Sequence, residues 1–245
     1  MKLAVIPLEK HCYNFYRRLI AEFDMMELDY NGAVVLGWLR LAYAITRIDV
    51  DTMKYESCFC QEVFDYEGAV SEMLEECGTE ITRFIYIWNV YEAFIKFLDI
   101  SKRGDTDQVI AFINKNYENE FPLPFYYHEI QDKLLQKYPK DIINKNVDWG
   151  LGGYALHIIR KRRNQIVHGD LKLPEPSMEQ GEKLNRFNHI PELFSRVMLT
   201  VMQMMTIAYL GGKYNCKLQA FKPEYLSYDK LDINVFRILH VTEVC

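Results

Sequence analysis

The stretch from Thr79 to Ile100, TEITRFIYIWNVYEAFIKFLDI, limits the fold more than any other part of the chain. It contains no proline or glycine, and a threonine and a glutamate at its start, Thr79 and Glu80, resemble a helix-capping sequence. In a helix, its apolar side chains would lie on nearly every side. A helix of this kind has to be covered by others, so the stretch is predicted to be the central helix of a bundle.

Helical periodicity also dominates the rest of the chain. Residues 11–28 and 33–48 predict two packed helices on either side of a turn at 29–32, and 49–78 predicts a helix with loops. Glycines at 150, 152 and 153 indicate a flexible approach to the helix that follows them. Further helices are predicted at 107–117, 129–137, 154–168 and 191–210, the last with an apolar stripe formed by Phe194, Val197, Val201, Met204 and Ala208. The predicted fold class is therefore all-α.

The composition is typical of a globular protein. With 245 residues, 49% of them hydrophobic, the chain can bury a sizeable core, and no apolar run approaches the roughly 20 residues needed to cross a bilayer. The N-terminal segment becomes charged too early for a signal peptide, which predicts a cytoplasmic location. Cys58 and Cys60 could offer two thiolates to a metal, but no second pair accompanies them. The six cysteines are therefore interpreted as reduced structural thiols, and no metal site or cofactor is predicted.

One charged side chain lies on the apolar face of the helix predicted at 154–168. On a wheel of about 3.6 residues per turn, Arg163 lies in the middle of a face formed by Leu156, Ile159, Ile166 and Val167. Burying a guanidinium without a partner is unfavourable, so a carboxylate is expected opposite it. Glu92 is the only charged side chain in FIYIWNVYEAFI, and it shares a helix face with Trp88. A direct or water-bridged contact between Glu92 and Arg163 is predicted, although each side chain could instead reach solvent separately.

The same helix carries further polar residues near its end. Asn164 lies between Arg163 and His168, which are about 140° apart around an ideal helix, so the three could line one edge of a groove. Gly169 then supplies a left-handed stop that ends the helix. The formal net charge of −5 opposes contact with a polyanion unless basic residues gather in one place. They gather in the run Arg160, Lys161 and Arg162, which could bind an RNA backbone or could be a solvated helix face.

The run from Arg163 to Gly169, RNQIVHG, resembles the signature of the HEPN family, which has an arginine, a polar residue and a histidine four to six residues after the arginine. Trp88 followed by Glu92 in an apolar helix is similar to the abortive-infection-like branch of that family. The resemblance covers roughly residues 79–212. Residues 1–78 are accordingly interpreted as an N-terminal helical extension, and residues 213–245 as a C-terminal extension.

The resemblance implies an antiparallel helical bundle that dimerises, so that two copies of the motif face each other across a shared cleft. It implies a metal-independent endoribonuclease that uses the ribose 2′-hydroxyl of an RNA substrate as nucleophile and serves as a toxin or antiviral effector. His168 would be the general acid or base, Arg163 would steady the phosphate, and Asn164 would orient the histidine or bind phosphate. Held by Glu92, Arg163 would also orient the motif, and both roles can coexist at the edge of a cleft.

Two other functions fit the same residues. The first is a non-catalytic module of the same fold that binds RNA, a nucleotide or a protein partner. HEPN members that act in this way often lack the arginine or the histidine, whereas this chain has both Arg163 and His168. The second is a scaffold whose intact motif is silenced by an antitoxin or another regulatory partner. Substitution of His168 would separate an enzyme from a binding module.

Overall fold

The chain is mostly helical, which confirms the all-α fold class. The computed structural model describes residues 2–22, 30–55, 60–100, 106–117, 132–134, 136, 138, 150–170, 173, 181–213 and 241–244. Residues 132–134 and 136 of the helix predicted at 129–137 are helical, whereas the rest of that stretch and most of the C-terminal extension lie outside the described residues. The described elements, in chain order, are β1 (Lys2–Val5), α1 (Leu8–Glu22), α2 (Tyr30–Ala44), α3 (Gln61–Phe97), α4 (Thr106–Tyr117), α6 (Gly150–Val167), α7 (Gly181–Lys213) and β2 (Val241–Val244).

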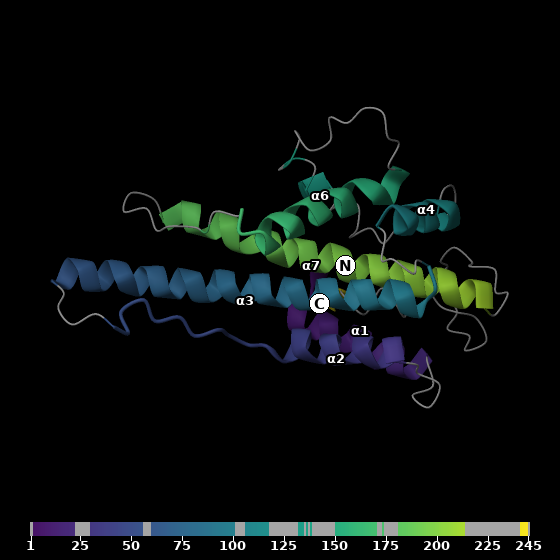
Figure 1. The fold of residues 1–245 in the computed structure, drawn as a ribbon, viewed down its shortest axis with the longest axis horizontal. Coiled ribbons are helices and arrows are strands. Elements are labelled where there is room, and N and C mark those ends of the chain that lie inside the picture. Colours follow the sequence, from purple (N-terminus) through teal and green to yellow (C-terminus); the bar gives the residue numbers. More distant parts are fainter. Residues whose placement is uncertain are drawn as a thin grey trace.

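α3 and α7 form the long axis of the molecule (Figure 1). The two helices lie side by side and run in the same direction, with the ring centroids of Phe84 and Phe194 5.5 Å apart. α1 and α2 pack together as predicted, through edge contacts of Tyr43 with Tyr13 and Tyr16. They cover one side of the α3–α7 pair, while α4 and α6 lie on the other side (Figure 1). The bundle thus carries α6, with its polar residues, on an outer layer.

The middle of α7 is deeply buried. The predicted apolar stripe is confirmed, but the burial extends round the helix, because every side chain from Phe194 to Ala208 is buried. The hydroxyl groups of this stretch donate to backbone carbonyls one turn earlier, Ser195 to Pro191, Thr200 to Arg196 and Thr206 to Met202, each at 2.8 Å. α7 also begins ten residues before Pro191, at Gly181. It is therefore a second central helix beside α3.

α3 begins much earlier than its sequence pattern indicates. It runs without a break from Gln61 to Phe97, so Thr79 and Glu80 lie inside it and do not cap it. The hydroxyl of Thr79 instead donates to the carbonyl of Glu75 at 2.6 Å, one turn earlier in the same helix. Few side chains before Thr79 are fully buried, which weakens the periodic signal there. The boundary interpreted between residues 78 and 79 therefore falls within a continuous helix.

Residues 45–52 form an extended segment along α3, here called the strap (Figure 1). Its backbone N–H groups donate to α3 side chains spaced one turn apart, Ile48 to Thr79 Oγ1 at 2.9 Å, Val50 to Glu75 Oε1 at 3.2 Å and Thr52 to Ser71 Oγ at 3.2 Å. Side chains four residues apart share one face of a helix, so these three can hold one straight segment. The stretch 49–78 was predicted as a helix with loops. Its residues 49–52 lie in the strap, and its residues 61–78 form the first turns of α3.

The two ends of the described chain meet in a short antiparallel sheet. β1 and β2 pair with Lys2 opposite Val244 and Val5 opposite Val241. Next to β1, the carbonyl of Ile6 accepts a hydrogen bond from Arg196 Nη1 of α7 at 3.0 Å, which ties this end to the core. Strands of four residues carry too few positions to show an alternating pattern, so this pairing was not predicted.

Candidate functional site

α6 places the predicted site at the edge of the bundle. The helix begins at Gly150, so the glycines expected to form a flexible approach lie in its first turn. Its middle is anchored in the core by the buried side chains Ala155, Leu156, Ile158 and Ile159. Arg160 then pairs with Asp107 of α4, with 3.4 Å between Nη1 and Oδ1. α6 is thus fixed along its middle, which sets the direction of its last turns.

The end of α6 is a Schellman motif. The N–H of Asp170 donates to the carbonyl of Gln165 at 2.8 Å, and the N–H of Gly169 donates to the carbonyl of Ile166 at 3.2 Å. Gly169 has a φ of 75°, a left-handed conformation that suits glycine. The left-handed stop predicted at Gly169 is therefore confirmed, and His168 directly follows Val167, the last residue of α6.

Arg163 reaches from α6 to α3. Its Nη2 lies 3.8 Å from Glu92 Oε1, and its guanidinium carbon lies over the ring of Trp88, 5.4 Å from the centroid. Its Nη1 donates to Asn164 Oδ1 at 3.3 Å. The structure therefore brings together four residues from two helices, and three of them were singled out from the sequence as site residues.

The carboxylate of Glu92 accepts a hydrogen bond from one residue and attracts the charge of another. The indole Nε1 of Trp88 donates to Glu92 Oε1 at 2.6 Å, and this is the oxygen that faces Arg163. At 3.8 Å the guanidinium is attracted by the carboxylate but lies beyond hydrogen-bond distance. The Nε of Arg163 is buried without a hydrogen-bond partner among the described residues. Arg163 is thus held in place while most of its N–H groups stay unused within the described part of the chain.

This edge of the bundle is more open than predicted. The side chain of Arg163 is 27% exposed and that of Glu92 is 41% exposed, so neither is a core residue. Ile166 is only half-buried and Val167 is 52% exposed, although both were assigned to the inward face. No described side chain of α6 after Ile159 is fully buried, because the helix leaves the core at that point.

His168 lies apart from the contacts of Arg163. Its side chain is exposed and makes no hydrogen bond or ion pair with the described residues. Its backbone N–H donates to the carbonyl of Asn164 at 2.9 Å, as in an ordinary helix. The angle of about 140° between positions 163 and 168 of a helix explains this separation. Within one chain, the structure brings Asn164 to Arg163 but leaves the imidazole of His168 on another side of α6.

The three basic residues before Arg163 differ in their contacts and in their exposure. Arg160 forms the ion pair with α4 described above. Arg162 lies over the ring of Tyr138, 4.1 Å from the centroid, and its Nη1 donates to Gln165 Oε1 at 2.7 Å. Lys161 is exposed, whereas Arg160 and Arg162 are half-buried. Tyr138 was not identified from the sequence, because a lone aromatic residue outside a periodic segment carries no spacing signal.

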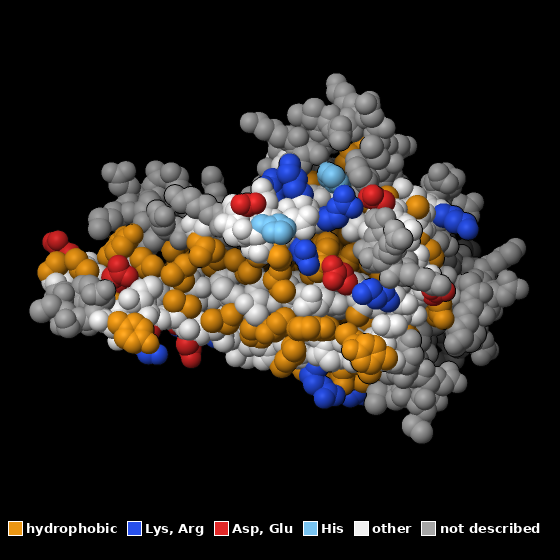
Figure 2. Space-filling view, in the orientation of Figure 1, with side chains coloured by type: hydrophobic (Ala, Val, Ile, Leu, Met, Phe, Trp, Pro, Cys, Tyr) orange, Lys and Arg blue, Asp and Glu red, His pale blue; other side chains and the backbone are white. Residues whose placement is uncertain are grey.

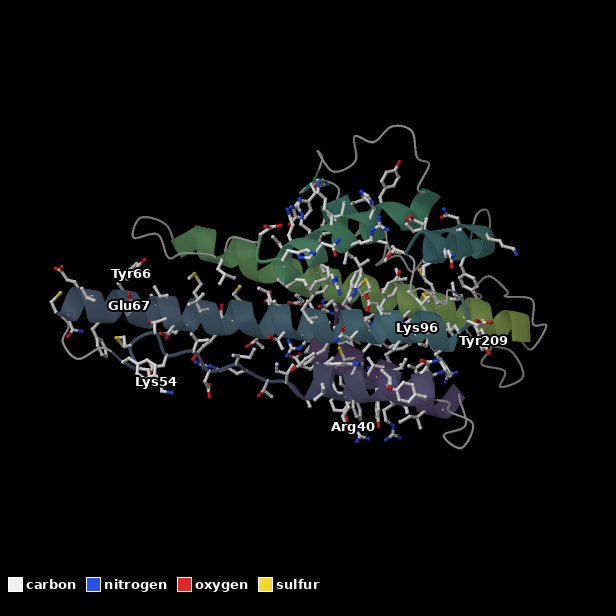
Figure 3. The ribbon with its side chains drawn as sticks, in the orientation of Figure 1. Arg40, Lys54, Tyr66, Glu67, Lys96 and Tyr209 are labelled. Carbon is white, nitrogen blue, oxygen red and sulfur yellow. The ribbon has the colours of Figure 1, made fainter. Side chains whose placement is uncertain are left out.

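Histidine and basic side chains gather on one face of the molecule over α6 (Figure 2). His side chains are visible there, with Lys and Arg side chains between and below them (Figure 2). On and directly after α6 the described histidines are His157, which is half-buried, and His168, which is exposed. On the adjoining α3, Lys96 lies one turn after Glu92 and is also exposed (Figure 3). Cations from two helices therefore lie near the site.

Comparison with known proteins leaves the site to be interpreted from its own chemistry. No protein-family model, curated protein or solved structure matches this chain.

Among the described residues, no three His, Cys, Asp or Glu side chains are close enough to hold a metal ion together. Cys60 is an exposed free thiol, whereas Cys58 lies outside the described residues. None of the described helices combines the length and the apolar character that a membrane crossing needs.

Proposed function

We propose that this chain is a metal-independent endoribonuclease of the HEPN type, acting in the cytoplasm as a toxin or antiviral effector. The observation that carries the proposal is the guanidinium of Arg163, which is held beside Glu92 and Trp88 while its Nη2 makes no hydrogen bond with the described residues. His168, five residues later, supplies an exposed imidazole at the end of the same helix. A fixed cation and a titratable group are the two functions that phosphodiester cleavage without a metal requires.

In the proposed reaction, the ribose 2′-oxygen attacks the phosphorus and the bond from phosphorus to the 5′-oxygen breaks. The proton of the 2′-hydroxyl passes to a general base, and a general acid protonates the leaving 5′-oxygen. The products carry a 2′,3′-cyclic phosphate and a 5′-hydroxyl. His168 serves in one of these proton transfers, because an imidazole exchanges protons near neutral pH, and a water molecule serves in the other. Arg163 offsets the negative charge that develops on the phosphate oxygens, and Asn164 orients its guanidinium.

A second copy of the chain completes this site. Within one chain His168 and Arg163 point to different sides of α6, about 140° apart around the helix. If two α6 ends face each other in a homodimer, His168 of one copy can lie beside Arg163 of the other. The exposure of His168 and Val167 supports such a contact. An antitoxin or another regulatory partner that covers the end of α6 would block both RNA access and dimerisation.

The test is incubation of the purified protein with total cellular RNA in EDTA, followed by analysis of the fragment ends for 2′,3′-cyclic phosphate. The wild-type chain is expected to cut, and His168→Ala is expected to lower the rate by about 100- to 10,000-fold. His157→Ala is the matched control, since position 157 lies about 16 Å away along the helix axis and should not reach the same phosphate. Circular dichroism checks the fold of both variants. Absence of cutting by the wild type, or equal cutting by His168→Ala, overturns the proposal.

One observation favours a second candidate, a non-catalytic module that binds RNA, a nucleotide or a protein partner. The imidazole of His168 makes no contact with Arg163 within one chain, so the two groups are not assembled for catalysis there. A binding module would use Arg163 without needing His168. RNA binding that survives His168→Ala, is lost in Arg163→Met and is never followed by cleavage would identify this function.

A further inference from the structure

Trp88 contacts both residues that surround the guanidinium site, one through its N–H group and one through its ring. Its indole Nε1 donates to Glu92 at 2.6 Å, and the guanidinium carbon of Arg163 lies 5.4 Å from its ring centroid. The ring itself is held by the core, because Trp88 is 4% exposed and packs against Phe84 and Tyr91 at centroid distances of 6.4 Å and 5.5 Å. The indole ring is thus held in a fixed position, and the long side chain of Arg163 packs over it.

A guanidinium that lies over an aromatic ring can still donate hydrogen bonds to a ligand. The attraction between a guanidinium and an aromatic ring acts on the face of the guanidinium, whereas its N–H donors lie around the edge. The carboxylate beside it attracts the cation but is already hydrogen-bonded to the indole, and its Oε1 lies 3.8 Å from Nη2. A long side chain is therefore restrained while only Nη1 is used as a donor, to Asn164 Oδ1 at 3.3 Å, and Nη2 makes no hydrogen bond with the described residues. The edge of the guanidinium suits two oxygens of a phosphate, which arginine can bind through paired N–H groups.

We propose that Trp88 is a positioning residue, which fixes Glu92 through its N–H group and supports Arg163 through its ring, so that the guanidinium is presented to a phosphodiester. The inference rests on the proposed function, because it takes the ligand of Arg163 to be RNA phosphate. Trp88 does not itself touch the substrate. It sets the geometry of the residue that does, and Glu92 prevents the cation from turning into solvent.

The contact can be tested without RNA by nuclear magnetic resonance of the indole N–H groups. Loss of one signal in Trp88→Phe identifies the Trp88 Nε1–H resonance. This resonance is expected to move in Arg163→Met, which removes the nearby charge, and to stay in place in the matched control Arg162→Met, whose guanidinium lies over Tyr138 instead. A Trp88 resonance that is the same in wild type and Arg163→Met overturns the contact.

The binding of a phosphate by Arg163 is then tested with a 2′-deoxy-substituted oligonucleotide. This oligonucleotide cannot be cleaved because it lacks the nucleophile. Its addition is expected to move the Trp88 resonance of the wild type and to leave that of Arg163→Met unchanged. A wild-type resonance that does not respond, or an equal response in Arg163→Met, overturns the positioning role. These results do not depend on whether the protein cuts RNA. A protein that shows both responses but never cleaves RNA overturns the proposed enzyme and retains Arg163 as a phosphate-binding residue.

Cleavage kinetics distinguish positioning from a purely structural role. Trp88→Phe keeps a ring under Arg163 but removes the N–H bond to Glu92, whereas Trp88→Leu removes both. The kcat is expected to fall by about 10-fold in Trp88→Phe and by about 100-fold in Trp88→Leu, with KM changed less than kcat. Thermal unfolding is measured in parallel. If kcat follows only the folded fraction of each variant, or is equal in both variants and the wild type, Trp88 does not position Arg163.

Discussion

Arg163 Nη2 lies 3.8 Å from Glu92 Oε1, in an ion pair between α6 and α3 in which both side chains are partly exposed. The same oxygen accepts the indole N–H of Trp88 at 2.6 Å. Glu92 therefore has two separate effects. It satisfies a buried donor of the core, and it attracts a cation at the surface. The two effects contribute differently to stability, because a buried unsatisfied donor costs more than a lost surface ion pair.

Glu92→Ala is expected to reduce the free energy of unfolding by about 1–3 kcal/mol, because it leaves the buried Trp88 N–H without an acceptor. Glu92→Gln keeps an acceptor oxygen and should cost less than about 1 kcal/mol, since only an exposed ion pair is lost. Urea unfolding followed by circular dichroism measures both values. Equal losses in the two variants would show that the charge of Glu92, and not its hydrogen bond, is the stabilising feature.

Lys161→Ala is expected to weaken RNA binding without changing the stability of the fold, because Lys161 is exposed beside the site. Loss of one phosphate contact should reduce the salt dependence of the binding constant by about 1 in the log–log slope. Lys54→Ala is the matched control, since Lys54 lies toward the opposite end of the molecule from Lys96 (Figure 3). Binding is measured by fluorescence anisotropy over a range of salt concentrations. Equal slopes in Lys161→Ala and wild type would show that Lys161 is not part of the proposed RNA-binding surface.

The sequence was sufficient for those parts of the fold that depend on apolar spacing or on one local rule. The buried stripe of α7 and the stop at Gly169 are of this kind. The approach of Glu92 to Arg163 was foreseeable for a related reason, because two lone charges on apolar helices have few other partners. The extent of their burial was not foreseeable, since it depends on where α6 leaves the core after Ile159.

Features that depend on distant polar contacts were missed. The strap is held by Ser71, Glu75 and Thr79 through its backbone, so its own side chains show no regular pattern. The pairing of β1 with β2 joins the two ends of the chain, and nothing in either short strand specifies its partner. The contact of Trp88 with Arg163 was missed for a similar reason. It depends on the packing of α6 against α3, which periodicity alone does not define.

Gly169→Ala and Gly78→Ala are expected to have opposite effects on stability. Gly169 has a φ of 75°, where an alanine is strained by about 1–2 kcal/mol. Gly78 lies inside α3, and an added Cβ would meet no atom within 4 Å, so alanine should stabilise the helix by about 1 kcal/mol. Thermal unfolding of the two variants beside the wild type measures both changes. A lower melting temperature for Gly78→Ala would mean that α3 is not continuous at this position.

Thr79→Val is expected to loosen the strap, because the methyl group that replaces the hydroxyl cannot accept the N–H of Ile48. An unsatisfied, partly buried N–H costs about 1–3 kcal/mol. Hydrogen exchange should become faster at Ile48 while the core amides of α7 keep their protection. Thr82→Val is the control, since the hydroxyl of Thr82 makes no hydrogen bond with the described residues. Unchanged exchange at Ile48 in Thr79→Val would show that the strap is held by other contacts.

Glu80 on α3 should make the stability of the protein depend on pH. Burial raises the pKa of its carboxyl from 4.5 to about 8, and the neighbouring carboxylates of Glu192 and Glu76 act in the same direction, while Arg83 opposes them. One carboxyl oxygen, Oε2, is buried without a hydrogen-bond partner among the described residues. The folded protein therefore keeps a proton that the unfolded chain releases above pH 4.5. Stability should fall as the pH rises from this value to about 8, and should change little through Glu80 above it.

Glu80→Gln removes the titration, so its melting temperature should exceed that of the wild type at pH 9, and the difference should shrink toward pH 5. Glu72→Gln, an exposed position on the same helix, is the control and should shift the melting temperature equally at both pH values. A difference between Glu80→Gln and wild type that does not vary with pH would mean that Glu80 is ionised in the folded protein. In that case Arg83 would outweigh burial and the two neighbouring carboxylates in the balance of effects on this carboxyl.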